Sequence, residues 1–297
     1  KKLYHKLISK DDKFYLSINR YERKKNISLA LKGFALSKES TAPNRKLLIV
    51  GGYDKRVSEN VEYLKELEQE AKDHKMSFKT IKYQDIIDTE DDKKVLAKII
   101  IDADVKVIFL TSISSRLRDY LIQNMELLIY TPENEHFGIV PLEAMRYGKP
   151  VLATNTGGPL ETVVSYRPND NEATATGWTK LAVPNIWAKA INEYVEVNDK
   201  VDFNTNGRER VRRLFSRNTM SDNFEETIER MIWKKKTTYP WETALNSTYY
   251  FGLYLLSAYF FPGQYLPCIF LAVYAAAIKR SYFWMCYYLF MAFLLTS

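Results

Sequence analysis

Short apolar runs alternate with amphipathic stretches along the first 230 or so residues of this chain. The apolar runs are bounded by glycine or polar residues, as is typical of strands buried on both faces of a parallel sheet. Between them, apolar side chains recur every three or four positions, as on one face of a helix. The runs that predict strands are 14–19, 46–52, 77–83, 105–111, 125–130, 151–155 and a short one at Trp178.

The helical pattern predicts a helix in most of the connections between these strands. A run of strand, helix and strand repeated along a chain predicts an α/β fold, here a Rossmann-like, doubly wound parallel sheet. The expected helices lie at Ile27–Ala35, around Val61–Leu67, at 93–101, from Phe137 to Gly148, after Pro159, and at 184–197, 202–216 and 219–233.

Composition changes sharply after Lys236. From Ala244 to Ser297 there are only two charged residues, Lys279 and Arg280, among many Tyr, Phe and Leu. The apolar runs there (249–261, 265–278 and 281–296) are each shorter than the ~20 residues that a helix needs to cross a bilayer. We expect 237–297 to be a hydrophobic, membrane-associated helical tail, as one or two spans, a re-entrant hairpin or interfacial helices. A buried soluble core is the alternative.

The net charge of the chain and its distribution limit the kinds of ligand that the chain is expected to bind. The formal net charge is +7, with Lys and Arg mixed among Asp and Glu and no basic stripe interleaved with aromatic residues. This pattern argues against nucleic acid and suits a diphosphate substrate and an anionic membrane surface. Both cysteines, Cys268 and Cys286, fall in the apolar tail, so no disulfide framework is expected and the rest of the chain is predicted to be cytosolic.

Two glycine turns follow consecutive predicted strands in the stretch Tyr130–Thr162. The first leads into the helix that opens at Phe137–Gly138, and the second, Gly157–Gly158, leads into a helix with Pro159 near its start. Loops after parallel strands lie at the edge of the sheet where ligands bind. The free N–H groups of Gly138 to Val140 at the helix start suit an anion such as a phosphate.

Two carboxylates flank this predicted anion site. Glu135 lies just before the helix and Glu143 lies eight residues later, inside it. Neither can neutralise a phosphate, so both are better explained as acceptors for sugar hydroxyls, and the pattern favours a sugar nucleotide.

The loop after the first predicted strand is basic. Arg20-Tyr-Glu-Arg-Lys-Lys25 should open at the same sheet edge, as a diphosphate site or as an ordinary solvated loop. After the second strand, Gly51 and Gly52 predict either close ligand approach or a plain tight turn.

The motif E-x7-E in EHFGIVPLEAMRYGKPVLAT, followed by GGPLE, resembles the signature of retaining GT-B glycosyltransferases of the glycosyltransferase 4 type. The resemblance extends from SINRYERKKN through LIVGGYD to TGWTKLAVP. In this detail it is most similar to the eukaryotic α-1,3/1,6-mannosyltransferases of dolichol-linked oligosaccharide synthesis. It implies the C-terminal half of a GT-B fold, with 1–13 as an interdomain linker and 14–236 as the donor-binding domain. The chain would then be a fragment that lacks the N-terminal domain.

The resemblance also implies roles for individual residues. Arg20 and Lys25 would hold the donor diphosphate, Glu135 the mannose hydroxyls and Glu143 the ribose hydroxyls. Thr111 and the loop to Ser115 would face the base. The start of the helix (Phe137, Gly138, Ile139 and Val140) would complete the donor site.

The implied activity is transfer of mannose, with retention, from GDP-mannose to a dolichol-diphosphate oligosaccharide at the cytosolic face of the endoplasmic reticulum, near other transferases of the pathway. No metal or other cofactor is expected. The alternatives are a transferase of the same type that uses a UDP-sugar, and a non-catalytic, membrane-bound subunit that binds nucleotide sugars. The surface around Phe137 and 231–233 is expected to be apolar and exposed, because it would meet the other domain.

Two further features are discounted. Asp102-Ala-Asp104 spells a metal–diphosphate motif, but it precedes a strand, on the edge opposite the ligands. His136 has no His or Cys cluster beside it, so it does not predict a metal site.

Overall fold

The computed structural model describes residues 13–82 and 105–233, with single residues and pairs between 245 and 289. The predicted helix at 93–101, the Asp102–Asp104 motif and nearly all of the predicted linker lie outside the described residues, as does most of the apolar tail. The chain divides into two compact units, 1–222 and 223–297.

Within the described residues, seven strands form one sheet in the order β3-β4-β2-β1-β5-β6-β7, and every pairing is parallel. The predicted doubly wound sheet is therefore confirmed. The strands are β1 (Lys13–Ile18), β2 (Arg45–Gly51), β3 (Phe78–Lys82), β4 (Val107–Thr111), β5 (Leu127–Tyr130), β6 (Val151–Thr154) and β7 (Gly177–Lys180).

The predicted helices in the described residues are present, with two differences. The helix after Pro159 is a single turn, because Val163 is already extended. Helix α4 follows β4 and was not predicted, although Ser114 caps it by accepting from the Leu117 amide and Leu117 and Leu121 bury one face. The helices are α1 (Ile27–Leu36), α2 (Ser58–Asp73), α4 (Ser115–Asn124), α5 (Ile139–Arg146), α6 (Pro159–Thr162), α7 (Pro184–Val197), α8 (Phe203–Leu214) and α9 (Arg217–Trp233), with short 3-10 turns at Arg23–Lys25 and Lys38–Ser40.

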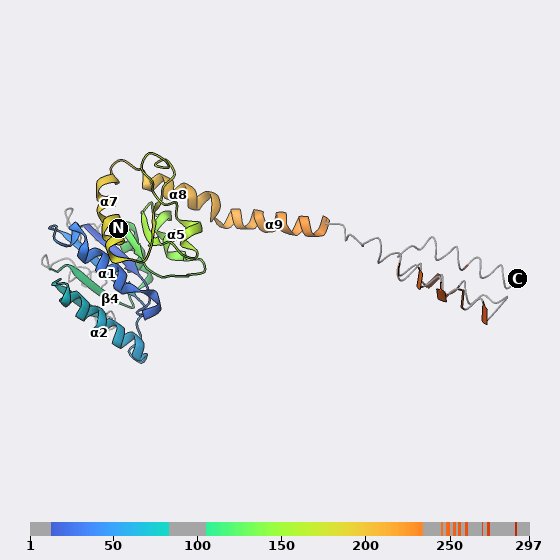
Figure 1. The fold of residues 1–297 in the computed structure, drawn as a ribbon, viewed down its shortest axis with the longest axis horizontal. Coiled ribbons are helices and arrows are strands. Elements are labelled where there is room, and N and C mark those ends of the chain that lie inside the picture. The colour runs from blue at the N-terminus through green and yellow to red at the C-terminus, as the bar shows by residue number, and fades with distance from the viewer. Residues whose placement is uncertain are drawn as a thin grey trace. The chain divides into compact units, whose positions relative to one another are not determined.

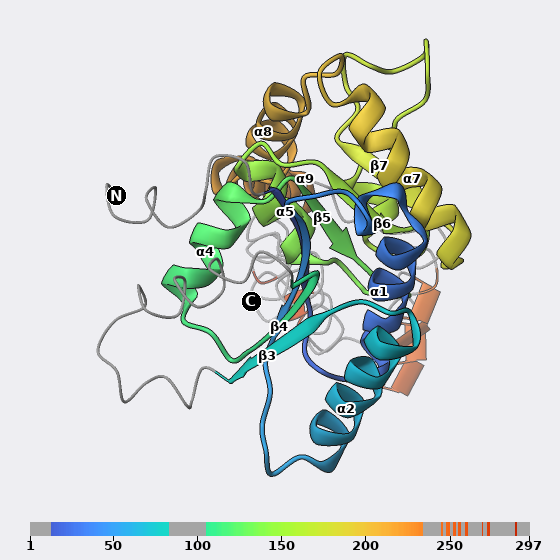
Figure 2. The same ribbon diagram turned by 90° about the vertical axis from the view of Figure 1, so that its left-hand side faces the viewer.

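Alternate residues of each strand point to opposite faces of the sheet, and each face has its own core. On one face, residues such as Tyr15, Leu47 and Phe109 pack with α1, α2 and α7. On the other, Leu16 and Leu48 pack with α4 and α5. Figure 2 shows α1 and α2 on one side of the strands and α4 on the other. Both faces are covered, which explains why the strands read as continuous apolar runs.

The strand order changes direction at β1: β2 to β4 are added on one side of this strand, and β5 to β7 are added on the other. This strand pairs with β2 on one side and with β5 on the other. The connections after β1 and β5 therefore diverge and leave a crevice at the carboxyl ends of the two strands. In open α/β sheets ligands bind at such a switch point. Figure 1 shows the fold of this unit, with the helices α1, α2, α5, α7 and α8 labelled around the strands.

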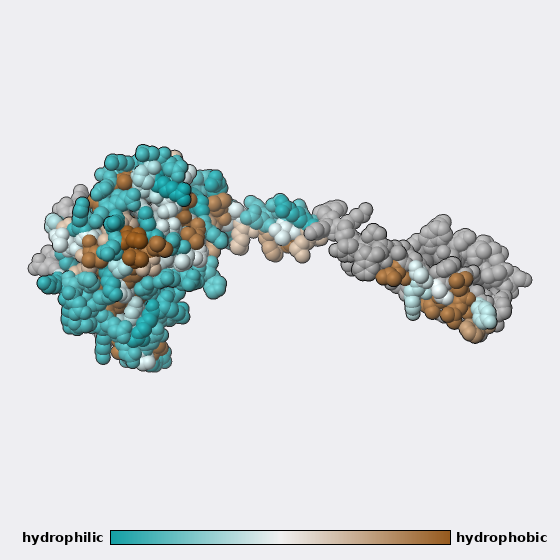
Figure 3. All heavy atoms as spheres, viewed as in Figure 1, coloured by the Kyte–Doolittle hydropathy of each residue, from teal (hydrophilic) through white to brown (hydrophobic). Residues whose placement is uncertain are grey.

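Helix α9 exposes an apolar stripe. Phe224, Ile228 and Met231 recur at helical spacing and are all exposed, Met231 at 72%. Figure 3 shows one side of this helix as hydrophobic and the other as hydrophilic. Phe137 is also exposed, at 46%, so the expected exposure is found at Phe137 and Met231, while the side chains at 232 and 233 lie outside those described.

In the part of the chain that the structure describes, no helix combines the length and the hydrophobicity needed to cross a membrane.

Candidate active site

A pocket of about 490 Å³ lies at the carboxyl edge of the sheet, at the switch point. Residues at or just after the carboxyl ends of four neighbouring strands (β4, β2, β1 and β5) meet in it, together with one residue each from α4 and α5. The lining residues are Ile18, Asn19, Arg20, Lys25, Val50, Gly51, Gly52, Ser112, Ile113, Arg118, Tyr130 and Val140. The predicted basic loop thus faces the same cavity as the start of the glutamate-bearing helix.

The two glycines after β2 have different reasons to be glycine. A Cβ on Gly51 would overlap the carbonyl oxygen of Asn19 and lie 2.7 Å from its carbonyl carbon, so the β1 and β2 chains approach too closely for a side chain. A Cβ on Gly52 would lie 3.4 Å from the Arg20 side chain, which is an ordinary contact. Gly51 is therefore required by the approach of the two strand ends.

Hydrogen bonds hold the basic loop against the loop after β5. The Thr131 hydroxyl donates to the Lys25 carbonyl at 2.7 Å, and the Asn26 side-chain amide donates to Glu133 at 3.0 Å. Asn26 adopts the left-handed conformation with φ 49°, which asparagine tolerates better than most residues. The position of Lys25 is consequently set by its backbone as well as by its side chain.

The Lys25 ammonium donates to Glu135 Oε2 at 2.6 Å. The two side chains are 16% and 29% exposed, so water screens this pair less than an ion pair at the open surface. An ammonium carries three N–H donors, and this bond uses one of them. The remaining donors of Lys25 are available to the pocket.

Arg20 is held from within its own loop. Its guanidinium contacts Glu22 Oε1 at 2.9 Å, and Lys24 contacts the other oxygen of Glu22 at 3.1 Å. The Arg20 side chain is 62% exposed while Glu22 is only 14% exposed, so Glu22 is the fixed member of this group. Arg20 keeps most of its guanidinium in contact with solvent at the rim of the pocket.

The start of α5 lies beside the pocket. Gly138 precedes the helix with φ 74°, a left-handed value that favours glycine. A Cβ there would lie 3.3 Å from the Tyr130 ring and hydroxyl, so glycine also makes room for that side chain. Burial, with a smaller contribution from Glu135, raises the pKa of Tyr130 above the usual tyrosine range. The first amides of α5 have no acceptor within the helix and can bind an anion.

The second glycine turn supports this helix start. The Gly158 amide donates to the Glu135 carbonyl at 2.7 Å. A Cβ on Gly158 would lie 2.5 Å from the carbonyl carbon and Cα of Phe137. The turn after β6 therefore braces the loop that carries Glu135.

Glu143 is paired with an arginine that was not among the predicted site residues. Arg118 Nη2 donates to Glu143 Oε1 at 3.0 Å, and Glu143 Oε2 is buried without a partner among the described residues. Arg118 belongs to α4, the helix that was not predicted, and it lines the pocket. An arginine in an amphipathic helix carries no signal of its own, and only the packing of α4 beside α5 reveals it.

Of the predicted site residues, Arg20, Lys25 and Val140 line the pocket, and the others (Thr111, Glu135, Phe137, Gly138, Ile139 and Glu143) do not. Thr111 is 1% exposed within β4, and its successors Ser112 and Ile113 line the pocket instead. Phe137 packs edge-on against Phe215 with ring centroids 6.1 Å apart, and Ile139 is 61% exposed. Tyr130 and Asn19 line the cavity and were not predicted, whereas Ser112 belongs to the loop from Thr111 to Ser115 that was predicted to face the base.

No group of three or more His, Cys, Asp or Glu side chains is placed to hold a metal ion in the described ranges, 13–82 and 105–233, or in the isolated residues beyond them.

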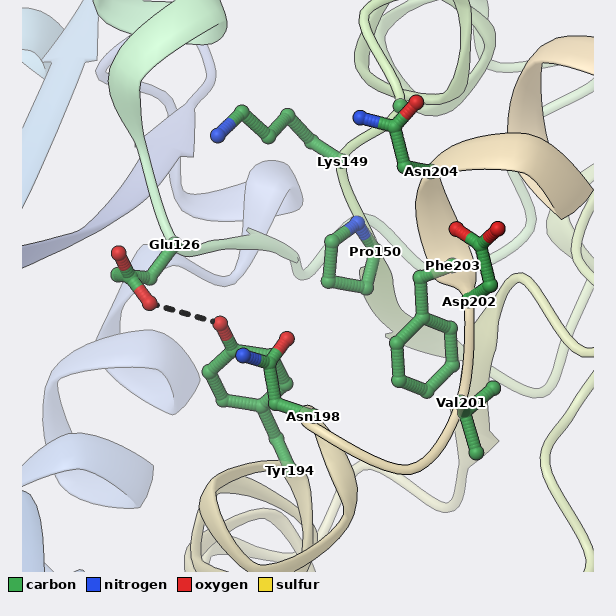
Figure 4. Close-up of a pocket in the computed structure, with 10 residues that line it drawn as sticks. Glu126, Lys149, Pro150, Tyr194, Asn198, Val201, Asp202, Phe203 and Asn204 are labelled. Atoms are coloured by element: carbon green, nitrogen blue, oxygen red, sulfur yellow. Dashed lines mark hydrogen bonds between the residues drawn. The ribbon is translucent and has the colours of Figure 1, made fainter.

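A second pocket, of about 260 Å³, lies at the opposite edge of the sheet, before β5 and β6 (Figure 4). Tyr194 donates to Glu126 at 2.9 Å there. Burial lowers the pKa of Lys149 below the usual lysine range, and Glu126 opposes the shift. None of the predicted donor-binding residues lines this pocket.

An all-parallel sheet with helices on both faces and a charged pocket at its switch point is the arrangement of an α/β ligand-binding domain. Residues 4–210 match the family model of glycosyl transferases group 1, and the chain belongs to this family. The match covers the whole sheet and every predicted site residue.

Among characterised relatives, the chain is similar to the alpha-1,3/1,6-mannosyltransferase ALG2 of Saccharomyces cerevisiae, at 47% identity over 292 residues. That alignment covers 98% of this chain and 57% of the yeast protein, so the chain spans little more than half the length of this relative.

Solved structures support the GT-B-like fold. The sucrose-phosphate synthase of Thermosynechococcus elongatus superposes with a TM-score of 0.56 at 22% identity, over 79% of this chain and 49% of that one. The C-terminal domain of the group 1 glycosyl transferase LpcC of Francisella tularensis superposes with a TM-score of 0.51 at 16% identity. That match covers 73% of this chain and 92% of the LpcC domain.

Proposed function

We propose that this chain binds GDP-mannose and contributes the donor site of a retaining α-mannosyltransferase that acts on a dolichol-diphosphate-linked oligosaccharide. The observation that carries the proposal is the meeting of Lys25 and Glu135, 110 residues apart, beside the start of α5 at the switch point of the sheet. The similarity to the yeast protein, which is named as an alpha-1,3/1,6-mannosyltransferase, supports the choice of sugar and linkage.

Cations and amides on one side of the pocket suit a departing nucleoside diphosphate. Lys25 and Arg20 can stabilise the negative charge that accumulates on the diphosphate as the glycosidic bond breaks. Lys25 can do so without leaving Glu135, because its ammonium has donors to spare. The amides at the start of α5 add further donors that are already oriented.

Glu135 and Glu143 act on the hydroxyl groups of the donor in this proposal. Glu135 accepts from the mannose and Glu143 from the ribose, and both are held by cations, Lys25 and Arg118. The sugar passes through an oxocarbenium-like transition state, which a fixed carboxylate and the bound diphosphate can stabilise. Neither glutamate is assigned as a covalent nucleophile.

A donor-binding panel tests the proposal. Calorimetry with GDP, GDP-mannose, UDP and ADP should show the tightest binding for the two guanosine ligands. Lys25→Met should weaken GDP binding about ten- to a hundredfold, the loss expected for a charged hydrogen bond. A preference for UDP would favour the UDP-sugar alternative, and a lack of binding to every nucleotide would refute the proposal.

A substitution at Glu135 separates binding of the sugar from binding of the nucleoside diphosphate. Glu135→Gln should leave GDP affinity within about threefold, because a glutamine amide oxygen can still accept from Lys25. It should weaken GDP-mannose binding about tenfold, because the charged acceptor for the sugar hydroxyls is lost. Glu196→Gln is the matched control, since Glu196 is exposed on α7 and neither lines the pocket nor contacts the loops that form it. Equal losses of GDP and GDP-mannose in Glu135→Gln would contradict the assignment to the sugar.

Catalysis needs the acceptor held close to the bound donor. We expect the chain alone to transfer no mannose, and to transfer it when combined with the portion of the yeast relative that it does not span. Binding of GDP-mannose with no transfer in any such mixture would favour the non-catalytic subunit.

We also propose that the protein acts at the cytosolic face of the endoplasmic reticulum membrane, anchored by its charge-poor tail. The motivating feature is the presence of only two charged residues from Ala244 to Ser297. Carbonate extraction of the intact chain from vesicles distinguishes spanning from surface attachment, and full recovery in the soluble fraction without vesicles would contradict a membrane tail.

A further inference from the structure

Arg118 joins two helices that the sequence separates. It lies near the start of α4, lines the donor pocket, and donates through Nη2 to Glu143 on α5 at 3.0 Å. A second contact, to its neighbour Asp119, is longer at 3.4 Å. The shorter contact of its guanidinium is thus to the carboxylate that the proposed function assigns to the ribose.

The Glu143 carboxylate depends on this contact. Its side chain is 27% exposed, and Oε2 is shielded from water with no hydrogen-bond partner among the described residues. A carboxylate held in this way has lost part of its hydration, and the charge of Arg118 offsets that loss. Without Arg118 the carboxylate would turn towards water, away from its present orientation.

The contact leaves Glu143 able to bind a ligand. An ionised carboxylate has about four lone-pair positions, and Arg118 takes one of those on Oε1. A ribose presents two neighbouring hydroxyls that can donate to the remaining positions. We propose that Arg118 is a positioning residue that orients Glu143 to accept the ribose hydroxyls of a nucleoside diphosphate. This role rests on the proposed function.

A purely structural brace between α4 and α5 is the competing explanation. These helices already share an apolar core, in which Leu117 and Leu121 of α4 belong to the same cluster as Ala144 and Met145 of α5. Arg118 is 37% exposed, and ion pairs at that exposure contribute little to folding stability. The ion pair is therefore not needed to hold α4 against α5, whereas the orientation of the Glu143 carboxylate depends on it.

The test compares ribose recognition rather than overall affinity. Calorimetry measures the Kd of the intact chain for GDP, 2′-deoxy-GDP and 2′,3′-dideoxy-GDP. The parent should prefer GDP over the dideoxy compound by about tenfold or more, since two hydrogen bonds to a charged group are lost. Arg118→Gln should reduce this preference to about threefold or less, and Arg118→Lys, which keeps a charged donor, should recover part of it.

Three controls separate the explanations. Arg116→Gln removes the same charge from the same helix at an exposed position that does not line the pocket, and it should keep the full preference. In a Glu143→Gln background, Arg118→Gln should have no further effect on the preference, because Arg118 acts through Glu143. Urea unfolding should show similar midpoints for Arg118→Gln, Arg118→Lys and Arg116→Gln.

The outcomes are distinct for the two proposals. If the parent fails to bind GDP, the proposed function fails and this role fails with it. If the parent binds GDP with the expected ribose preference and both Arg118 variants keep that preference, the proposed function stands and the positioning role is overturned. A lower urea midpoint with an unchanged preference would assign Arg118 to the structural brace.

Discussion

Adjacent glycines at the end of β2 give a sharp test of how the pocket is built. Gly51→Ala adds a methyl group that would overlap the Asn19 carbonyl oxygen and lie 2.7 Å from its carbon, closer than the 3.0 Å that real Cβ atoms keep. Both atoms belong to the backbone, so a change of side-chain rotamer cannot relieve the overlap. Gly52→Ala adds the same group 3.4 Å from the flexible Arg20 side chain, which is ordinary contact.

The cost of Gly51→Ala follows from the hydrogen bonds around it. Relief of the overlap requires the ends of β1 and β2 to separate. Two backbone bonds join these ends: the Asn19 amide donates to the Val50 carbonyl at 2.9 Å, and the Tyr21 amide donates to the Gly52 carbonyl at 3.1 Å. At about 1 kcal/mol each, their loss would lower the free energy of unfolding by about 2 kcal/mol. Gly52→Ala should change it by less than about 1 kcal/mol.

Urea unfolding and GDP calorimetry on the two variants check this reasoning. Gly51→Ala should lose stability and bind GDP at least about tenfold more weakly, because Asn19, Arg20 and Gly51 all line the pocket. Gly52→Ala should resemble the parent in urea unfolding, although Gly52 also lines the pocket. If the two variants behaved alike, the close approach of the strand ends would not be the reason for glycine at position 51.

Three other predictions concern the second pocket and the tail. Lys149→Met should raise the free energy of unfolding at pH 7 by about 1 kcal/mol, because burial disfavours the charged lysine. The pKa of Lys149 is lower in the folded chain, so the stability gained by Lys149→Met is largest below that folded pKa and should vanish above the ordinary lysine pKa of 10.5. Urea titrations at several pH values check this, and a gain that stayed constant with pH would contradict it. Tyr194→Phe removes the 2.9 Å hydrogen bond to Glu126 and should cost about 1 kcal/mol in the same assay, with GDP binding unchanged. Removal of residues 237–297 should release the protein from vesicles in a flotation assay while the near-ultraviolet circular dichroism of the remaining chain persists; unchanged flotation would place membrane binding elsewhere.

The sequence alone determined the elements of this fold and the approximate place of the site. Strands such as 46–52 read as continuous apolar runs because both faces of the sheet are buried. Gly138 and Gly148 mark the ends of α5 because both residues adopt left-handed φ values, 74° and 73°. These are local properties, and a local pattern in the sequence is sufficient to encode them.

Local patterns also have limits in this chain. Helix α4 carries usable signals, the Ser114 cap and Leu117 four residues before Leu121, yet it is short and rich in polar residues and was not predicted. Thr111 and the loop to Ser115 were predicted to face the base. Thr111 is buried at the end of β4, and Ser112 and Ile113 of that loop line the pocket. The backbone leaves the strand at Ser112, where φ is 52°, and the apolar pattern does not reveal this turn.

Only the tertiary structure decided which charges meet. Lys25 lies against Glu135, which is 110 residues away along the chain, because β1 pairs with β5. Arg118 reaches Glu143 because α4 and α5 cover the same face of the sheet. Strand order and helix packing minimise the free energy of the whole buried core, so they depend on every element at once. The sequence near Lys25 or Arg118 carries no record of the partner, since each contact is the result of packing between segments that are distant along the chain.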